Sequence, residues 1–308
     1  MKPAIAVIDV HRTYKVHTEF HANPSAQNTI ILVNGSLATT ASFAQTVKYL
    51  GTQFNVVLFD QPYAGQSRAH NCNEHCITKE DEAAILLDLI DHYGAQYLMS
   101  FSWGGIASML ALSKRPPTLV KAIFASFSPI LNEPMLDYLS RALVCLSQED
   151  GDQVGHLINT TIGKHLPSLF KRCNHKHTSR LTAHEYRQMH AHVQQVLRMQ
   201  AHCHLDRLGD IDIPLLFVNG ELDEYTSAGD ARLMARYITD CHFATVSDTG
   251  HFIDMEHKGA WLQTQNAMLG FLQHSASGKG FTSHPGLHAM AVRSPGCEPK
   301  MPGFSLNG

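Results

Sequence analysis

The sequence has no long apolar run and little excess charge of either sign. Its net charge is −3 over 308 residues. Proteins that bind nucleic acid usually present a strongly basic surface, so we expect no such partner. No apolar stretch approaches the ~18 residues that a membrane-spanning helix needs. The opening segment, residues 1–10, is too short and too interrupted for a secretory signal peptide, and it predicts a first strand.

Cysteine is also scarce, with seven residues scattered along the chain. An odd number at irregular spacing does not indicate a disulfide framework, so we expect reduced thiols and a cytoplasmic location. Two groups rich in histidine and cysteine, at residues 70–76 and 202–204, have the composition of metal ligands. A structural zinc site usually takes two separated pairs of ligands, and neither group supplies a second pair. We therefore expect neither a metal nor a resident cofactor.

The most informative motif is a short turn around Ser102. Between the apolar runs 97–99 and 106–112, the chain reads Ser100-Phe101-Ser102-Trp103-Gly104-Gly105. This pattern predicts a strand, a sharp turn and a helix, with the serine hydroxyl pushed out above a sheet. It also places that hydroxyl near the unpaired N–H groups of a helix start. The usual form is G-x-S-x-G, in which the turn needs small residues, and Ser100 here replaces the first glycine.

An acid and a histidine follow at the ends of two later predicted strands. Asp223 comes three residues after Gly220, which ends a strand that begins at Leu215, and His251 follows the apolar run 243–246. The order Ser102, Asp223, His251 is that of the α/β-hydrolase catalytic triad. In such a triad, histidine takes the serine proton and returns it to the leaving group, while the carboxylate fixes the imidazole tautomer.

Neighbouring residues offer alternatives for two of these roles. Glu221 and Glu224 flank Asp223 and could replace it as the acid. Ser126 and Ser128 follow the next predicted strand, but without a glycine that would form a sharp turn. We prefer Asp223 because of its spacing from the glycine that ends the strand.

The oxyanion that forms in acyl transfer needs backbone N–H donors. We assign one donor to Trp103, which follows the nucleophile. The second should come from the loop after the run 29–33, which reads Asn34-Gly35-Ser36-Leu37. We assign it to Ser36, with Leu37 as the next candidate, and the alternative is that this segment is a plain Asn-Gly turn.

Alternating elements predict the architecture. Strands are expected near residues 4–10, 29–34, 54–60, 97–101 and 121–126, with helices over 79–92 and 255–272. This alternation predicts an α/β protein with a mostly parallel sheet and helices on both faces.

The pattern changes after residue 130. Residues 131–207 contain no convincing strand, one helix is expected to open at Pro134, and Thr182-x-x-Glu185 is a capping box before another. We interpret residues 131–207 as a helical lid inserted into an α/β-hydrolase core of residues 1–130 and 208–274, with the sheet resuming at Ile211. Residues 275–308 are expected to form a flexible C-terminal tail.

The expected lid contains a basic segment. Residues 153–184 hold no acidic residue and five lysines and arginines, namely Lys164, Lys171, Arg172, Lys176 and Arg180. On a chain with negative net charge, such a local patch suggests docking of an acidic partner or of phosphate groups. The alternative is a solvated polar surface.

Several segments resemble one bacterial enzyme family. Residues 34–44, 54–60, 100–105 and 250–252 resemble the (R)-3-hydroxyacyl-ACP:CoA transacylases of polyhydroxyalkanoate synthesis, where ACP is acyl carrier protein and CoA is coenzyme A. The 3-(3-hydroxyalkanoyloxy)alkanoate synthases of rhamnolipid synthesis share many of these residues. The resemblance covers residues 4–275, and segments 127–135 and 163–172 are more similar to the transacylase branch.

The resemblance implies an activity and two partners. A medium-chain (R)-3-hydroxyacyl group would pass from ACP, an acidic protein, to an acyl-serine and then to CoA, which is a substrate and not a cofactor. The triad does not select the acceptor. Water would give a thioesterase, and the 3-hydroxyl of a second acyl chain would give the rhamnolipid-precursor synthase. An ordinary carboxylesterase and a non-catalytic ACP-binding protein are further alternatives, although a pure binder has no need of an intact triad.

One departure from the family pattern concerns His177. An H-x-x-x-x-D acyltransferase box has been discussed for the transacylase branch, but Thr182 stands five residues after His177 here. No other histidine has aspartate at that spacing. We therefore expect the triad to act without such a box.

Overall fold

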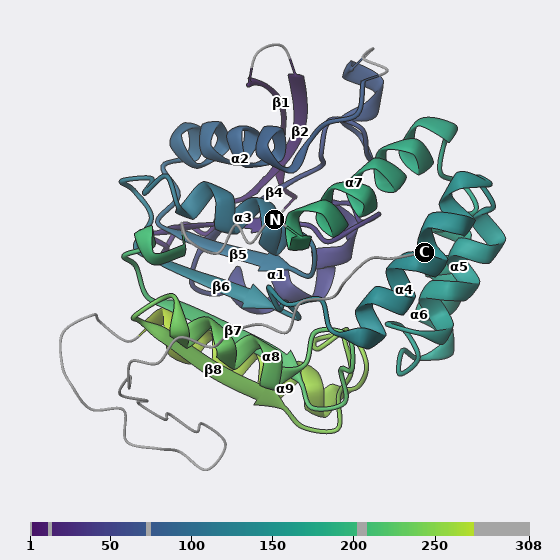
Figure 1. Ribbon diagram of the computed structural model, residues 1–308. Helices are drawn as coiled ribbons and strands as arrows, with labels where there is room; N and C mark the ends of the chain where they lie inside the picture. Colours follow the sequence, from purple (N-terminus) through teal and green to yellow (C-terminus); the bar gives the residue numbers. More distant parts are fainter. Residues whose placement is uncertain (1, 12–13, 72–74, 202–207, 274–308) are drawn as a thin grey trace.

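Figure 1 shows the fold in a computed structural model, which describes residues 2–11, 14–71, 75–201 and 208–273. The tail expected over residues 275–308, the histidine–cysteine group at 202–204 and Cys72 of the other group lie outside these residues.

An eight-stranded sheet forms the centre of the molecule. Its strands lie in the order β1-β2-β4-β3-β5-β6-β7-β8. The β1–β2 and β2–β4 pairs are antiparallel, and every later pair is parallel. The strands are Ala4–Val10 (β1), Tyr14–His21 (β2), Thr29–Val33 (β3), Asn55–Phe59 (β4), Tyr97–Phe101 (β5), Lys121–Ala125 (β6), Leu215–Gly220 (β7) and Cys241–Val246 (β8).

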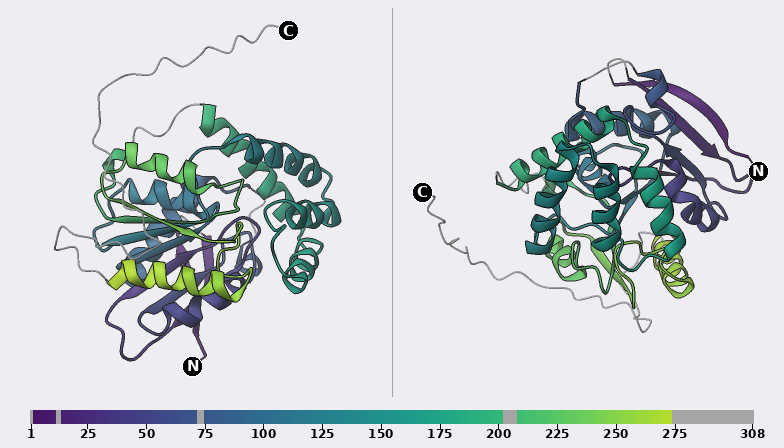
Figure 2. Two further views of the ribbon diagram at one scale, coloured as in Figure 1. Left: turned by 90° about the horizontal axis from the view of Figure 1, so that it is seen from below. Right: turned by 90° about the vertical axis from the view of Figure 1, so that its right-hand side faces the viewer.

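Helices cover both faces of this sheet (Figures 1 and 2). Ile31 and Val33 of β3 pack in a cluster with α2, α3 and α8, whereas Ile30 and Leu32 pack in a second cluster with α1 and α9. Because both faces are covered, all of β3 is buried and its sequence is almost continuously apolar. These helices are Ala44–Leu50 (α1), Lys79–Tyr93 (α2), Gly104–Leu112 (α3), Ala228–Arg232 (α8) and Lys258–Gln273 (α9). The expected α/β class with a mostly parallel sheet is confirmed.

Two expected element starts were wrong, and one strand was not predicted. Strand β2 was not predicted, because polar residues interrupt its apolar alternation of Tyr14, Val16 and Phe20. The sheet resumes at Leu215 and not at Ile211, since the intervening Pro214 has no N–H for a strand ladder. Helix α9 begins at Lys258 and not at residue 255, because the preceding segment forms a turn around the side chain of residue 256.

In the described part of the chain, four α-helices lie between β6 and β7, and we call residues 133–201 the helical insertion. The helices are Glu133–Ser147 (α4), Gly151–Thr160 (α5), Ser168–Thr178 (α6) and Ala183–Ala201 (α7). Figures 1 and 2 show them together at the end of the sheet where the parallel strands finish. Pro134 lies in the first turn of α4, and Thr182 and Glu185 form the expected capping box. The apolar faces of the insertion pack on each other and on Trp103.

A polar seam attaches α7 to the core. The side chain of Gln188 accepts from the backbone N–H of Ile77 at 2.8 Å and donates to its carbonyl oxygen at 2.7 Å. Arg68 Nη1 lies 2.6 Å from Glu185 Oε2. Because separating buried polar partners is costly, α7 is a firmly held wall of the insertion.

No helix in the described part of the chain is long and apolar enough to cross a membrane. Over the same residues, no three His, Cys, Asp or Glu side chains gather as a metal site would require.

Candidate active site

Ser102 lies at a strained turn between β5 and α3. Its φ is +50°, in the left-handed region that non-glycine residues rarely adopt. Two hydrogen bonds hold this turn, from the Ser102 N–H to the carbonyl oxygen of Ala125 at 2.8 Å and from the Gly105 N–H to the carbonyl oxygen of Ser102 at 2.9 Å. Backbone strain fixed in this way is typical of a functional position.

Two positions of the motif take a small residue for different structural reasons. A side chain at Gly104 would place its Cβ 2.5 Å from the carbonyl oxygen of Asn34, so this position requires glycine. Ser100 is fully buried between its strand partners Val33 and Phe124, where a hydroxymethyl group still fits. Serine at the first glycine position is therefore compatible with the turn.

The structure brings the three predicted triad residues together. His251 Nε2 lies 3.0 Å from Ser102 Oγ, and His251 Nδ1 lies 2.8 Å from Asp223 Oδ2. The three residues come from the loops after β5, β7 and β8, whose carboxyl ends meet at one edge of the parallel sheet. Their exposed fractions are 8% for Ser102, 4% for Asp223 and 2% for His251. The arrangement suits a serine nucleophile activated by histidine, in a site largely closed to water.

The carboxylate of Asp223 is held in its charged form. Burial raises its pKa, but the charge and hydrogen bond of His251 and the hydrogen bonds from Thr226 outweigh burial and lower the pKa to about 2. Thr226 Oγ1 donates to Oδ2 at 2.6 Å, while the N–H groups of Tyr225 and Thr226 donate to Oδ1. An ionised carboxylate behind the ring stabilises an imidazolium.

The neighbouring acids have other partners. Glu221 Oε2 accepts from the N–H of Asp248 at 3.0 Å, and Glu224 Oε1 pairs with Lys164 Nζ at 2.8 Å. Of the three acids in this loop, Asp223 is the one whose side chain contacts the ring of His251.

The alternative serines are structural. Ser126 Oγ donates to the carbonyl oxygen of His251 at 2.5 Å, so it supports the histidine loop. Ser128 Oγ accepts from the N–H of Ile130 within its own turn.

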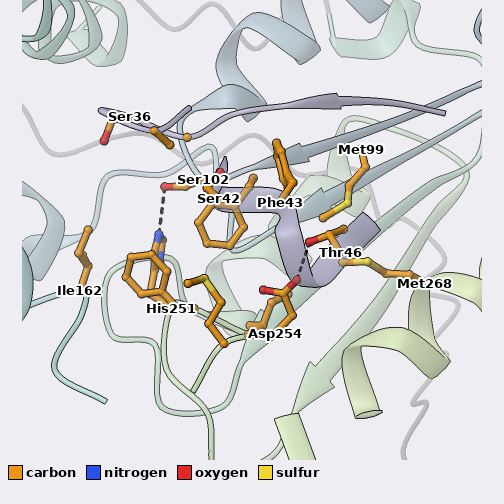
Figure 3. A pocket seen from close by; sticks show the side chains of 16 residues that line it. Ser36, Ser42, Phe43, Thr46, Met99, Ser102, Ile162, His251, Asp254 and Met268 are labelled. Carbon is orange, nitrogen blue, oxygen red and sulfur yellow. Dashed lines mark hydrogen bonds between the residues drawn. The ribbon is translucent and has the colours of Figure 1, made fainter. Parts of the chain in front are cut away.

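A cavity of about 70 Å³ opens beside Ser102 (Figure 3). Ser36, Ser102, His251 and Ile162 lie at one end in Figure 3, and Met99 and Met268 lie at the other. Ser36 thus lies beside the nucleophile, where a second oxyanion donor is expected. A second cavity of about 20 Å³ is lined by Ser36, Trp103 and apolar side chains of the insertion.

One acid lies in the wall of the larger cavity. Thr46 Oγ1 donates to Asp254 Oδ2 at 2.6 Å. Burial raises the pKa of Asp254, against the lowering effect of this hydrogen bond. A raised pKa favours the neutral form of this carboxyl, which costs less to place beside apolar groups than the charged form.

Comparison with known proteins identifies the family. The model of the alpha/beta hydrolase fold matches residues 28–155. A protein of Pseudomonas aeruginosa named (R)-3-hydroxydecanoyl-ACP:CoA transacylase is 56% identical over 273 residues, which cover 89% of this chain and 91% of the relative. This chain belongs to that transacylase family. A relative of the same name from Ectopseudomonas oleovorans is 53% identical over 295 residues, covering 95% of this chain and 100% of the relative.

Solved structures support the fold of this transacylase chain. A hydrolase from Pseudomonas aeruginosa matches with a TM-score of 0.71 and 18% identity, covering 88% of this chain and 98% of that one. An alpha/beta hydrolase from a Medee basin deep-sea metagenome library matches with a TM-score of 0.73 and 15% identity, covering 90% and 100%. At such low identity the likeness shows the fold alone.

In this transacylase chain, His177 supports the loop of Ser36. His177 Nε2 lies 2.6 Å from the carbonyl oxygen of Leu37, which has a φ of +56°. Thr182, five residues later, serves in the capping box of α7. The contact of His177 is therefore with the backbone beside Ser36.

The sequence did not point to several supporting residues of the site. Thr226 orders the carboxylate of Asp223, and Ser126 holds the backbone of His251. Glu256 accepts from the N–H groups of Gly250 and Phe252 on either side of His251. Asp223 and Thr226 are three residues apart, a spacing at which an aspartate often accepts from a backbone N–H, and this was the one local indication in the sequence. The other contacts join positions that form no recognisable motif.

The five predicted docking residues divide into two groups. Lys164 pairs with Glu224, and Lys171 Nζ donates to the carbonyl oxygen of Lys164 at 2.7 Å. Arg172, Lys176 and Arg180 are exposed and follow one another at four-residue spacing on and just after α6. At that spacing Arg172 and Lys176 share one side of α6, and Arg180 follows two residues after the end of the helix.

Proposed function

We propose that the chain transfers a medium-chain (R)-3-hydroxyacyl group from ACP to CoA through an ester on Ser102. The observation that carries the proposal is the contact chain Ser102–His251–Asp223 in a member of this transacylase family. A role in supplying polyhydroxyalkanoate synthesis stays a prediction of the family resemblance.

In the first half-reaction, His251 takes the proton of Ser102 as Oγ attacks the thioester carbonyl. The tetrahedral oxyanion lies against the N–H groups of Trp103 and Ser36. The carbon–sulfur bond then breaks, and the ACP thiol leaves with the proton that His251 returns. Asp223 stabilises the imidazolium throughout.

In the second half-reaction, His251 takes the proton of the CoA thiol. The thiolate attacks the ester carbonyl, and Ser102 Oγ leaves and regains its proton. Water at the same position would give the free hydroxy acid instead. The low exposure of Ser102 and His251 favours a carried thiol over bulk water.

We assign the acyl chain to the cavity of Figure 3. Ser102 and His251 both line this cavity, whereas the smaller cavity under the insertion is lined by neither. Its far end is lined by Met99 and Met268, whose flexible side chains can adapt to an alkyl chain. These methionines would then limit the chain length.

The exposed cations of α6 are the proposed docking site for ACP. Arg172 and Lys176 lie on one side of α6 together with Leu169, which is 60% exposed, and the exposed Arg180 follows the end of the helix. Acidic carrier protein is complementary to such a surface. In this account the helical insertion acts as the lid, and a cytoplasmic location agrees with the free thiols of the described cysteines.

The test is product analysis by mass spectrometry. The purified chain is incubated with (R)-3-hydroxydecanoyl-ACP, with and without CoA, in parallel with Ser102→Ala. We expect (R)-3-hydroxydecanoyl-CoA from the wild type and none from Ser102→Ala. Free acid in both tubes would make the chain a thioesterase, and coupled dimeric acid would make it a synthase of the rhamnolipid branch. Absence of any product together with ACP binding would support the non-catalytic alternative.

A further inference from the structure

The loop between α5 and α6 covers the active site. We call residues 161–167 the latch loop. Ile162 lines the cavity of Ser102 and His251, and Figure 3 shows its side chain facing them. The ring of His165 packs against Gly250, since a Cβ on that glycine would lie 2.6 Å from His165 Cδ2. The latch loop therefore contacts both the cavity beside Ser102 and the loop that carries His251.

An ion pair holds this loop in place. Lys164 Nζ lies 2.8 Å from Glu224 Oε1, and Glu224 directly follows the triad acid. The two side chains are 33% and 59% exposed. A partly exposed pair of this kind contributes little stability and can exchange partners in water.

The two sides of the insertion are attached differently. The α7 side is fixed by the buried hydrogen bonds of Gln188 to Ile77 and by the pair of Arg68 with Glu185. On the latch loop, the ion pair of Lys164 with Glu224 and the packing of Ile162 and His165 reach the core, whereas Lys171 Nζ donates to the carbonyl oxygen of Lys164 within the insertion. The attachment of the latch loop to the core thus uses a partly exposed ion pair, whereas that of α7 uses buried hydrogen bonds.

The chemistry of the substrates supplies a competitor for Glu224. Acyl-ACP and CoA carry the same arm, a pantetheine whose far end bears a phosphate. Lys164 lies in the segment 153–184, which contains no acidic residue. The phosphodiester of ACP and the diphosphate of CoA present negatively charged oxygens, and one of these can replace the carboxylate of Glu224 as the partner of Lys164.

We propose that Lys164 is the binding residue for the phosphate of the pantetheine arm, and that it leaves Glu224 when that phosphate arrives, which opens the latch loop. This inference rests on the proposed function, because it takes the substrates to be phosphopantetheine thioesters. One phosphate site then serves both half-reactions, and the serine ester stays covered until a carried thiol is present.

The test compares donors that differ in the phosphate. The burst of free thiol on Ser102 acylation is measured with (R)-3-hydroxydecanoyl esters of ACP, CoA and pantetheine, the last lacking phosphate. Lys164→Gln should slow acylation by the ACP and CoA donors about tenfold, which corresponds to the loss of one charged contact. With the pantetheine donor, Lys164→Gln and Glu224→Gln should both be about two- to fivefold faster, because each breaks the latch.

Matched variants control for folding and for general charge. Lys114→Gln makes the same change at an exposed lysine outside the insertion and should alter none of the rates. Lys164→Arg should retain the response to phosphate.

Two results would overturn the proposal. Equal slowing of all three donors by Lys164→Gln would indicate a merely structural role. Slowing with ACP but not with CoA would assign Lys164 to the surface of the carrier protein. Failure of the wild type to form acyl-CoA would reject the transacylase function separately, because the burst reports acylation alone.

Discussion

The sharpest test of the catalytic roles is Asp223→Asn. The carboxylate Oδ1 accepts two backbone N–H bonds, from Tyr225 and Thr226, so the amide oxygen of asparagine is expected to take that place. The amide NH₂ then occupies the position of Oδ2, which in the wild type lies 2.8 Å from His251 Nδ1. The ring nitrogen Nδ1 therefore faces a donor in place of an acceptor. Donation from the amide to Nδ1 puts the ring proton on Nε2, where it blocks transfer from Ser102.

The expected effect is large because the tautomer is wrong and the charge is gone. The corresponding exchange in a serine protease triad lowers kcat by about 10⁴, and we expect a loss of that order here. The measurement is steady-state formation of acyl-CoA, with thermal unfolding to verify that the variant is folded.

Glu221→Gln is the matched control for Asp223→Asn. Its side chain lies in the same loop but binds the N–H of Asp248, so we expect less than a tenfold loss. If Asp223→Asn kept more than a tenth of the activity while Glu221→Gln lost most of it, the assignment of the acid would be wrong.

Three further predictions follow from the same site. Thr226→Val removes the 2.6 Å donor to Asp223 Oδ2 and should lower kcat roughly tenfold or more with little change in KM, measured by initial rates. Met268→Ala should shift donor preference toward longer acyl chains in a mixed-substrate competition and lower the free energy of unfolding by about 2–5 kcal/mol; an unchanged preference would remove the acyl chain from this cavity. Because the folded-state pKa of Asp223 is depressed to about 2, its ionisation should contribute about 2 kcal/mol of stability above pH ~4 that is lost as pH falls toward ~2. Denaturant unfolding of the wild type and Asp223→Asn between pH 5 and pH 3 measures this, and a difference that does not shrink on acidification would contradict it.

The sequence was most informative where chemistry depends on local geometry. The turn at Ser102 needs small residues within a few positions, and these are visible in the chain. Asp223 and His251 lie in the loops that follow β7 and β8, so strand ends and chain order were enough to locate them.

Other features depend on contacts between distant segments and leave little local trace. Ser126 reaches the backbone of His251, 125 residues away, and no motif records that pairing. The charge pattern indicated a basic segment, but it could not show that Lys164 already has a partner in Glu224. Strand β2 was missed because it lies toward the antiparallel edge of the sheet, where polar side chains mix with apolar ones.

Trapping the acyl-enzyme shows whether Ser102 carries the acyl group between ACP and CoA. The protein is mixed with (R)-3-hydroxydecanoyl-ACP without CoA, the carrier is removed, and the peptide containing Ser102 is weighed before and after CoA is added. We predict that this peptide carries one hydroxydecanoyl group, which CoA discharges as hydroxydecanoyl-CoA faster than water releases it. An unmodified Ser102 in a protein that still forms hydroxydecanoyl-CoA would mean that the acyl group does not pass through Ser102.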